Sequence, residues 1–309
     1  MPAIAYHKGS FMPLDEAKVG IMTHALHYGT AVFEGIRGNW NNNHEKLYVF
    51  RLREHMERLL QGCSILRINL PLSVDQLCDI TVEMIKKCGY KEDLYIRPVA
   101  YKSAEKVANL KLQELEDDFF VLAIPFGKYL DSDGAIHCCT SSWRRIDDTM
   151  IPPRVKLAGI YINNILAKSD AVLSGFDEAI LLNQDGHVCE GSGENIFVIK
   201  DNKISTPSLD SNVLPGITRD TVKSLIQQEL GLDLIERSID RSELYLADEV
   251  FLTGTAAHLT SVGQIDHRNI GSGEVGPITK ELSRFYFQIV KGDNPKYLHF
   301  CTAISSSNT

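Results

Sequence analysis

The sequence is poor in the features that mark membrane, secreted and fibrous proteins. It has no run of about 18 apolar residues that would cross a bilayer. Its opening stretch, MPAIAYHKGSFMPLDEAKVG, contains no apolar core followed by a cleavage site. No low-complexity tract occurs before the tail Ser305–Thr309, which we expect to fray. We therefore expect a globular chain that neither spans a membrane nor is secreted.

Positive charge and paired cysteines are also scarce. The 32 Lys and Arg residues are outnumbered by 40 Asp and Glu residues, so the net charge is -8, and nucleic acid and anionic lipid are poor partners. The seven cysteines are odd in number, and none has the C-x-x-C spacing of a zinc or redox motif. We expect no metal site, no thiol switch, and free thiols in a reducing, cytoplasmic setting.

What the chain does have is length and an apolar fraction large enough for more than one core. Its 309 residues are 44% hydrophobic, and a single domain usually holds roughly 100–150 residues. We predict a small α+β domain at 1–128, an interdomain linker at 129–135 within a turn-rich stretch, and a large mixed α/β domain at 136–309.

Local patterns predict several elements. Apolar residues at helical spacing indicate a helix over 53–65, and a capping box of Ser73 and Gln76 opens a second helix that Gly89 ends. Gln184-Asp185-Gly186 predicts a hairpin turn. Further strands are expected at 47–50, 94–101, 119–126, 178–183, 187–190, 195–199 and 249–253, and further helices from Gly216 to Gly231 and over 278–290.

Two glycine-containing turns are candidates for anion binding. In Pro215-Gly216-Ile217-Thr218, glycine permits close approach and the first amides of a helix point at a ligand. Gly254-Thr255-Ala256-Ala257 follows a strand and also exposes amides. Most turns of either kind bind nothing, so a tight turn is the alternative in both cases.

Charged residues in unusual contexts are the candidates for chemistry. Lys156 has apolar neighbours whose packing would bury it and lower its pKa, although an exposed or ion-paired lysine fits equally. The stretch Glu190–Asn195 places two carboxylates in a glycine-rich turn, where a plain surface turn is the alternative.

Two arginines lie on regular elements. Arg58 lies on the polar face of its helix, where a pair with Glu54 is the simpler explanation. Tyr95 and Arg97 share one strand face and suit a carboxylate, but an exposed sheet face would look the same.

Together these segments resemble the branched-chain aminotransferases of the class IV pyridoxal-phosphate family, from about Ser10 to Lys291. The resemblance rests on seven strings: HALHYGTAVFEGIR from His24, FRLREHMERL from Phe50, YIRP from Tyr95, VKLAGIY from Val155, EGSGENIF from Glu190, LPGITRD from Leu214 and YLADEVFLTGTAA from Tyr245.

The resemblance implies a fold and a set of cofactor contacts. The fold would be the two-domain type IV architecture, similar to D-amino-acid aminotransferase, with mixed α+β and α/β structure. Lys156 would bind pyridoxal 5'-phosphate covalently and shuttle a substrate proton, because its amine is tethered beside the reacting carbon. The other cofactor contacts would be Glu190 at the ring nitrogen, Tyr161 at the ring hydroxyl, and Arg58, Ile217, Thr218 and Thr255 at the phosphate.

The resemblance also implies the substrates. Amino groups would pass reversibly from L-leucine, L-isoleucine or L-valine to 2-oxoglutarate, with ping-pong kinetics. The substrate α-carboxylate would meet Tyr95 and the amides of Ala256 and Ala257, the distal carboxylate of glutamate would meet Arg97, and the pocket walls would be Tyr28, Phe33, Phe126 and Tyr129. The partners would be amino acids, 2-oxo acids and further copies of the chain, as a dimer at least or a hexamer built as a trimer of dimers.

Some features depart from the family pattern. Phe126 stands where tryptophan is frequent in bacterial relatives, and His258 where an acidic residue is common. Both positions bear on substrate preference. The alternatives are another class IV activity, such as D-amino-acid aminotransferase or aminodeoxychorismate lyase, and a non-catalytic protein that binds the cofactor.

Overall fold

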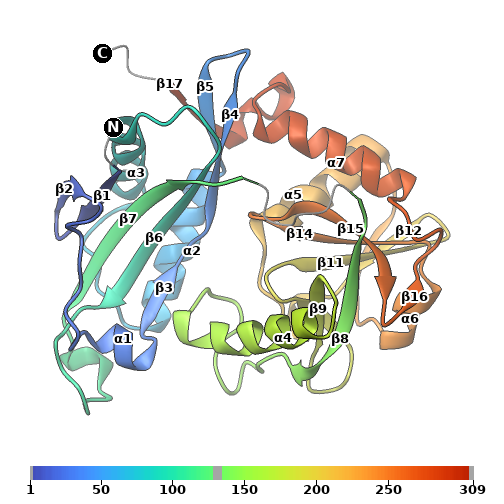
Figure 1. Ribbon diagram of the computed structural model, residues 1–309, viewed down its shortest axis with the longest axis horizontal. Coiled ribbons are helices and arrows are strands. Elements are labelled where there is room, and N and C mark those ends of the chain that lie inside the picture. The colour runs from blue at the N-terminus through green and yellow to red at the C-terminus, as the bar shows by residue number, and fades with distance from the viewer. Residues whose placement is uncertain (1–2, 128–133, 306–309) are drawn as a thin grey trace. The chain divides into compact units, whose positions relative to one another are not determined.

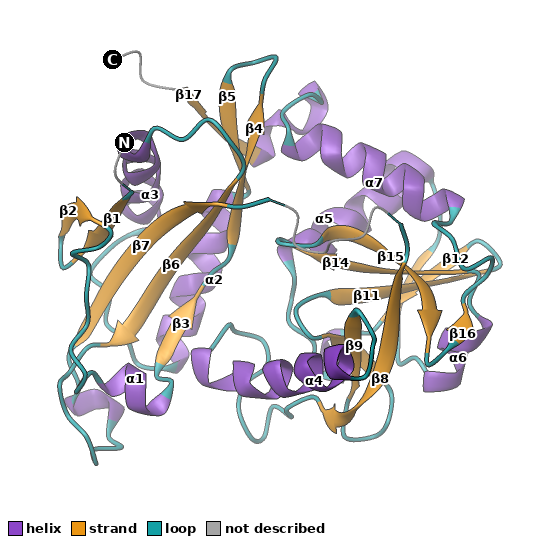
Figure 2. Cartoon of the chain, in the orientation of Figure 1, coloured by secondary structure: helices purple, strands orange, loops and turns teal. Residues whose placement is uncertain are grey.

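The structure is a computed structural model that describes residues 3–127 and 134–305. The chain forms two compact units, each built on its own sheet (Figures 1 and 2). Unit 1 comprises Met1–Gly127, Val155–Gly159 and Gln288–Thr309, and unit 2 comprises Lys128–Arg154 and Ile160–Phe287. Two short segments from the second half of the chain thus belong to unit 1, and one of them carries Lys156. The division into domains 1–128 and 136–309 stays a prediction, and most of the expected linker at 129–135 lies outside the described residues.

The sheet of unit 1 is antiparallel throughout. Its strands follow the order β17-β5-β4-β6-β7-β1-β2, and β3 pairs with β6. The strands are β1 Ile4–His7, β2 Ser10–Pro13, β3 Ala31–Phe33, β4 Ile36–Asn41, β5 Lys46–Phe50, β6 Leu94–Lys102, β7 Asp117–Pro125 and β17 Cys301–Ser305. Ser305, which we expected to fray, pairs with Lys46 at the end of β17.

Two long helices cover this sheet, beside the shorter α1 His24–Tyr28 and the 3-10 turns Leu112–Glu114 and Pro295–Phe300. In α2 Leu52–Ile65, the apolar residues Met56, Leu59 and Cys63 are buried, as the helical spacing predicts. The helix α3 Val74–Cys88 begins with the predicted capping box and ends at Gly89, which is left-handed with φ 66°.

The sheet of unit 2 is mixed. Its order is β10-β9-β8-β15-β14-β11-β12-β13, and β16 pairs with β15. The strands are β8 Ile136–Arg144, β9 Glu178–Leu182, β10 Val188–Gly191, β11 Asn195–Lys200, β12 Lys203–Thr206, β13 Leu234–Glu236, β14 Glu249–Gly254, β15 His258–Ile265 and β16 Arg268–Asn269. The predicted hairpin joins β9 to β10 with Gly186 at φ 90°.

Helices bury both faces of this second sheet. The helix α4 Tyr161–Leu173 follows the turn Ala158–Ile160 and connects the parallel strands β8 and β9. Cys139 packs toward α4, whereas Cys138 joins the core on the opposite face, which α6 Arg241–Leu246 also supplies. The adjacent cysteines therefore reflect strand alternation, and all seven cysteines are free.

The remaining helices include the one that opens at the predicted anion turn. It begins as α5 Ile217–Leu225, changes to a π-helical turn over Ile226–Leu230, and ends at Gly231 with φ 61°. A 3-10 turn, Leu209–Ser211, precedes it, and α7 Pro277–Val290 is the last long helix. Within the described ranges, no helix is both long enough and apolar enough to cross a bilayer.

Candidate active site

Lys156 lies in a short loop segment of unit 1 that pairs with β3 and is tightly turned, since the Leu157 amide donates to the Val155 carbonyl at 3.1 Å. The Phe33 amide donates to the Lys156 carbonyl at 3.0 Å, and Val32 forms an antiparallel bridge with Leu157. Val155 and Leu157 are buried, whereas Lys156 is half-buried and its Nζ lies 6.0 Å from the centre of the Phe33 ring. The apolar neighbours are thus buried on either side of a tight turn, at whose centre the Lys156 side chain stays half-buried.

Arg58 belongs to a buried cluster with Glu34 and His55. Its Nε and Nη2 donate to the two carboxylate oxygens of Glu34 at 2.7 and 2.8 Å, and His55 Nδ1 lies 2.8 Å from Glu34 Oε2. Burial alone would raise the pKa of Glu34, but the charge and hydrogen bonds of Arg58 outweigh it and hold that pKa far below its usual range. Burial lowers the pKa of His55. The Glu54 side chain pairs instead with Arg51, at 2.7 Å.

Tyr95 and Arg97 meet on one face of β6, as their spacing predicts. Arg97 Nη2 donates to the Tyr95 hydroxyl at 2.6 Å, and the guanidinium carbon lies 4.3 Å from the centre of the Phe33 ring. The Tyr95 and Phe126 rings lie 5.1 Å apart. A Cβ on Gly35 would overlap the Tyr95 hydroxyl, so the glycine makes room for this side chain.

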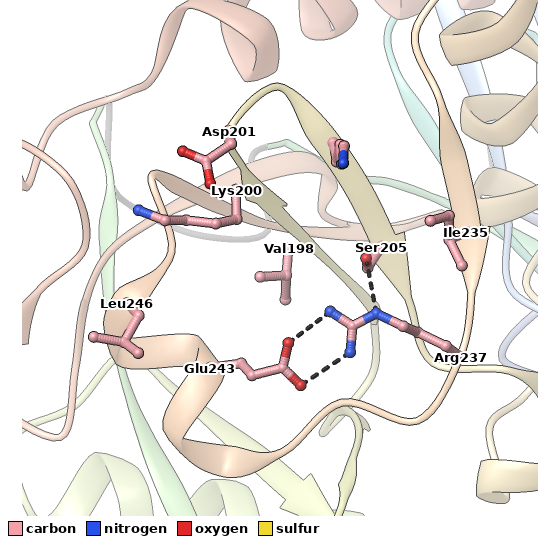
Figure 3. A pocket seen from close by; sticks show the side chains of 9 residues that line it. Val198, Lys200, Asp201, Ser205, Ile235, Arg237, Glu243 and Leu246 are labelled. Atoms are coloured by element: carbon pink, nitrogen blue, oxygen red, sulfur yellow. Dashed lines mark hydrogen bonds and ion pairs between the residues drawn. The ribbon is translucent and has the colours of Figure 1, made fainter.

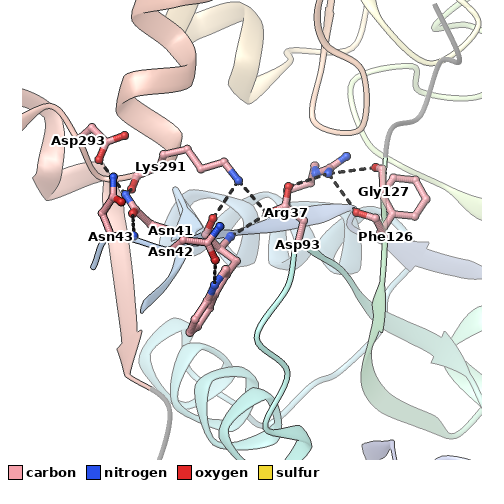
Figure 4. A network of polar contacts seen from close by, with 10 residues as sticks. Arg37, Asn41, Asn42, Asn43, Asp93, Phe126, Gly127, Lys291 and Asp293 are labelled. Atoms are coloured by element: carbon pink, nitrogen blue, oxygen red, sulfur yellow. Dashed lines mark hydrogen bonds and ion pairs between the residues drawn. The ribbon is translucent and has the colours of Figure 1, made fainter. Parts of the chain in front are cut away.

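Arg37 holds the end of β7 and the Phe126 side chain in place (Figure 4). Its Nη2 donates to the carbonyls of Phe126 and Gly127, both at 3.2 Å, and its guanidinium carbon lies 5.1 Å from the centre of the Phe126 ring. Asp93 lies 3.6 Å from Arg37 and also accepts from Lys291 at 2.9 Å. The network ties the predicted pocket wall to β4.

The other predicted pocket residues are less closely grouped. Tyr28 ends α1, is 42% exposed, and its hydroxyl accepts from the Ala108 amide at 2.9 Å. Tyr129 lies outside the described residues.

Glu190 in unit 2 is a buried carboxylate that three donors hold. Arg145 Nε lies 2.9 Å from Glu190 Oε1. Glu190 Oε2 accepts from Asn195 Nδ2 at 3.1 Å and from the Leu214 amide at 2.9 Å. Arg145 in turn donates to Asn164 at 2.9 Å. A carboxylate held in this way is fixed in direction and balanced in charge.

The second acid of the same turn has a different environment. Glu194 accepts from the Gly193 amide at 3.0 Å and is only 4% exposed. Burial, with the nearby charge of Glu178, raises the pKa of Glu194 to about 8. Glu178 itself pairs with Lys168 at 2.6 Å. The two carboxylates that the sequence places together therefore differ in environment, because Glu190 is paired with Arg145 whereas Glu194 accepts from a backbone amide.

The anion-binding candidates lie at two turns of unit 2. Gly216 is the N-cap of α5, and a Cβ there would overlap Asn195 Oδ1. Thr218 is buried, with its hydroxyl 3.5 Å from that of Tyr286. The turn Thr255–Ala257 joins β14 to β15, where His258 is left-handed at φ 56° and packs on Phe287 at 5.0 Å between ring centres. Tyr161 is the first residue of α4.

These residues fit the chemical groups of pyridoxal phosphate. The pyridine nitrogen suits a buried carboxylate, which Glu190 provides. The phosphate suits a helix start with close backbone approach, which α5 provides in unit 2. A buried arginine such as Arg58 of unit 1 is also chemically suited to a phosphate. Sequence patterns gave no role to Glu34, His55 or Arg145, because each contacts a partner more than 20 residues away. Asn195 lies in the string EGSGENIF, five residues from Glu190, but no pattern assigned its side chain a role.

Unit 2 also has a cavity of about 350 Å³, away from the residues described above (Figure 3). Arg237 on its wall donates to both oxygens of Glu243, at 2.9 and 2.6 Å, and to Ser205 at 3.2 Å. Arg237 and Glu243 on its wall are thus paired with each other, and none of the lining residues is a predicted site residue.

Comparison with known families shows which family the chain belongs to. The family model for class IV amino-transferases matches residues 31–265, so the chain belongs to the class IV aminotransferases. A probable branched-chain-amino-acid aminotransferase of Aquifex aeolicus is 50% identical over 300 residues, covering 97% of this chain and 96% of that protein. Within the class, the chain belongs to the branched-chain-amino-acid aminotransferases, as the sequence resemblance predicts.

Solved structures agree in fold. The branched-chain aminotransferase of Thermoproteus uzoniensis with norvaline has a TM-score of 0.93 and 45% identity, covering 97% of this chain and 99% of that one. The T.th. branched-chain amino acid aminotransferase complexed with N-(5'-phosphopyridoxyl)-L-glutamate has a TM-score of 0.91 and 39% identity, covering 97% and 98%. These likenesses confirm the predicted fold class.

Proposed function

We propose that this chain, a branched-chain-amino-acid aminotransferase that uses pyridoxal phosphate, binds the cofactor on Lys156 and anchors it through residues of two buried ion pairs. Glu190 meets the ring nitrogen, Tyr161 the ring hydroxyl, and Arg58 the phosphate. The remaining phosphate contacts are Ile217, Thr218 and Thr255. The observation that carries this proposal is the Glu190 carboxylate, which is buried and held by Arg145 and the Leu214 amide.

The proton transfer falls to Lys156. When bound, the cofactor supplies an electron sink that lets the substrate Cα proton leave. The Lys156 amine takes that proton and returns it, because a base that is tethered beside the reacting carbon needs no separate encounter with the substrate. Its Nζ lies 6.0 Å from the centre of the Phe33 ring, a proposed wall of the pocket. The Glu190 carboxylate, kept charged by Arg145, favours a protonated ring nitrogen.

The substrate pocket has to accept an aliphatic chain and a carboxylate in turn. Arg97 receives the distal carboxylate of glutamate, and Tyr95, with the amides of Ala256 and Ala257, receives the α-carboxylate. Phe33 and Phe126 give the apolar walls that face the aliphatic chain, with Tyr28 and Tyr129 as further wall residues. The relatives solved with norvaline and with a phosphopyridoxyl-glutamate support this pair of substrate classes.

Replacing Lys156 by alanine tests the assignment. We expect turnover of L-leucine with 2-oxoglutarate to fall by at least about 10³-fold, because the proton shuttle is lost. Borohydride should fix the cofactor to the wild type and not to the variant. Lys203→Ala, an exposed lysine of β12, is the control and should behave as the wild type. A fully active Lys156→Ala variant contradicts the assignment, and conversion of D-alanine but not L-leucine by the wild type favours the alternative class IV activity.

We also infer a homodimer, with a trimer of such dimers as the larger alternative. In unit 2, α4 exposes apolar side chains along one side, including Ile162, Ile165 and Leu173 at 61%, 54% and 86% exposure. A contiguous apolar face of this kind is typical of an interface. Sedimentation should give at least twice the chain mass, and Ile165→Asp should lower it. The free cysteines support a cytoplasmic location.

A further inference from the structure

The Asn195 side chain contacts two parts of the candidate site at once. Its Nδ2 donates to Glu190 Oε2 at 3.1 Å and to the Leu214 carbonyl at 2.9 Å. The Leu214 amide donates to the same Glu190 oxygen at 2.9 Å. Asn195 therefore closes a small ring of hydrogen bonds that joins the carboxylate to the turn before α5.

The position of Asn195 is fixed by the sheet. Asn195 is the first residue of β11 and pairs in register with Thr253 on β14, and it is only 5% exposed. An asparagine amide has two N–H donors on one nitrogen, so it serves two acceptors without a second side chain. Aspartate, with the same shape, has no donor at that position.

The other side of the amide fills the space beneath the turn. A Cβ on Gly216 would overlap Asn195 Oδ1. Gly216 has φ -70° and ψ 134°, a conformation that alanine adopts without strain. The overlap that excludes a side chain at Gly216 is thus with the Asn195 amide, while Arg219 Cβ, at 3.3 Å, is a tight but lesser contact.

We propose that Asn195 is a positioning residue that locks Glu190 and the turn 214–218 into one rigid cradle, so that the sites for the ring nitrogen and the phosphate are set before the cofactor arrives. This inference rests on the proposed function of Glu190 and Thr218. A rigid cradle binds more tightly because less order has to be gained on binding. Loss of the two hydrogen bonds should therefore weaken cofactor binding about 10- to 100-fold.

The test measures binding rather than turnover. The apoenzyme is titrated with pyridoxamine 5'-phosphate, which cannot bond covalently to Lys156, and the dissociation constant is read by calorimetry. Asn195→Ala should raise this constant about 10- to 100-fold. The control is Thr206→Val, which removes a buried hydrogen bond to the Ile196 carbonyl on β11, and should raise it less than about twofold. Equal values for the two variants overturn the inference.

Gly216→Ala provides an independent arm that leaves residue 195 intact. Its Cβ must displace the Asn195 amide, so it should weaken binding to a similar extent. In the double variant Asn195→Ala/Gly216→Ala the overlap is gone, and the constant should not exceed that of Asn195→Ala alone. A further full loss in the double variant overturns the inference. If Asn195→Ala does not fold, Gly216→Ala alone carries the test, and binding equal to that of the wild type overturns the inference.

Failure of the proposed function has a separate signature. If Glu190→Gln and Thr218→Val both bind pyridoxamine 5'-phosphate as the wild type does, the site itself has been assigned wrongly. If both weaken binding and Asn195→Ala does not, only the positioning role falls.

Discussion

Each unit buries an arginine–carboxylate pair among its predicted site residues, but the roles of the two partners are exchanged. In unit 1 the arginine, Arg58, is the proposed ligand residue, and Glu34 supports it. In unit 2 the carboxylate, Glu190, is the proposed ligand residue, and Arg145 supports it. The phosphate is an anion and the ring nitrogen a proton carrier, so the two ends of one cofactor call for opposite charges.

The groups that hold Arg58 and Glu190 differ in number and in charge, which changes the cost of losing one of them. Glu34 accepts from Arg58 with both of its oxygens and adds a bond to His55, so a single carboxylate neutralises the local charge. Glu190 has Arg145 and, in addition, two neutral donors. An arginine left without its acid cannot lose its proton, whereas a carboxylate left without its cation can gain one. Loss of the acid in unit 1 is therefore expected to reduce stability more than loss of the arginine in unit 2.

The largest expected effect follows from this difference. Glu34→Gln should cost about 3–5 kcal/mol in the free energy of unfolding, because Arg58 stays buried and charged. Arg145→Met should cost less, about 1–3 kcal/mol, because Glu190 keeps two donors and can be protonated. Urea unfolding of both variants measures the two losses. Equal losses, or a larger loss for Arg145→Met, would show that the neutral donors contribute little.

The sequence predicted elements whose cause is local. The helix α3 was found because its cap, its apolar spacing and Gly89 lie within one short stretch. The sequence does not predict the strand β8, with the run IHCCTSSWR, because only its first residues alternate between buried and exposed, and its later residues are mostly polar and partly or fully exposed. The strand β17 was missed because its partner β5 lies at the other end of the chain.

The residues of the candidate site likewise separate into those with a local signal in the sequence and those without one. The turn before α5 carries its own signal, since a glycine ahead of a helix start is visible in the sequence. Lys156 is a candidate because of its apolar neighbours, and its cofactor role comes from the resemblance. The neighbours Val155 and Leu157 are buried, whereas Lys156 lies in a tight turn and is half-buried. Glu34 carries no local signal, because the fold brings Arg58 to it from 24 residues away. Asn195 is close to Glu190 in the sequence, but its second partner, the Leu214 carbonyl, is brought to it by the fold.

A second prediction extends the comparison to Arg97, the arginine of unit 1 that donates to the neutral hydroxyl of Tyr95. Gly35→Ala places a Cβ on that hydroxyl and should displace both side chains. We expect KM for L-glutamate to rise about 10- to 100-fold, and KM for L-leucine to rise less, because only glutamate presents a second carboxylate. Steady-state kinetics with both donors measure this. The control is Gly127→Ala, where a Cβ meets nothing within 4 Å, and equal rises for the two donors would separate Arg97 from substrate selection.

The smallest expected effect concerns Glu194, the carboxylate of unit 2 that accepts from a backbone amide. Its pKa is raised to about 8 from an ordinary 4.5, so the stability that its proton contributes is complete below pH 4.5 and is lost as pH rises through 8. Between pH 7 and 9 the wild type should lose at most about 1.4 kcal/mol, whereas Glu194→Gln, which has no proton to lose, should not show this loss. Glu274→Gln, an exposed site, should follow the wild type. If the wild type and Glu194→Gln show the same dependence on pH, Glu194 is already charged at neutral pH. Both acids of the turn, Glu190 and Glu194, are then anions, with Arg145 and the neighbouring amides among the groups that hold them.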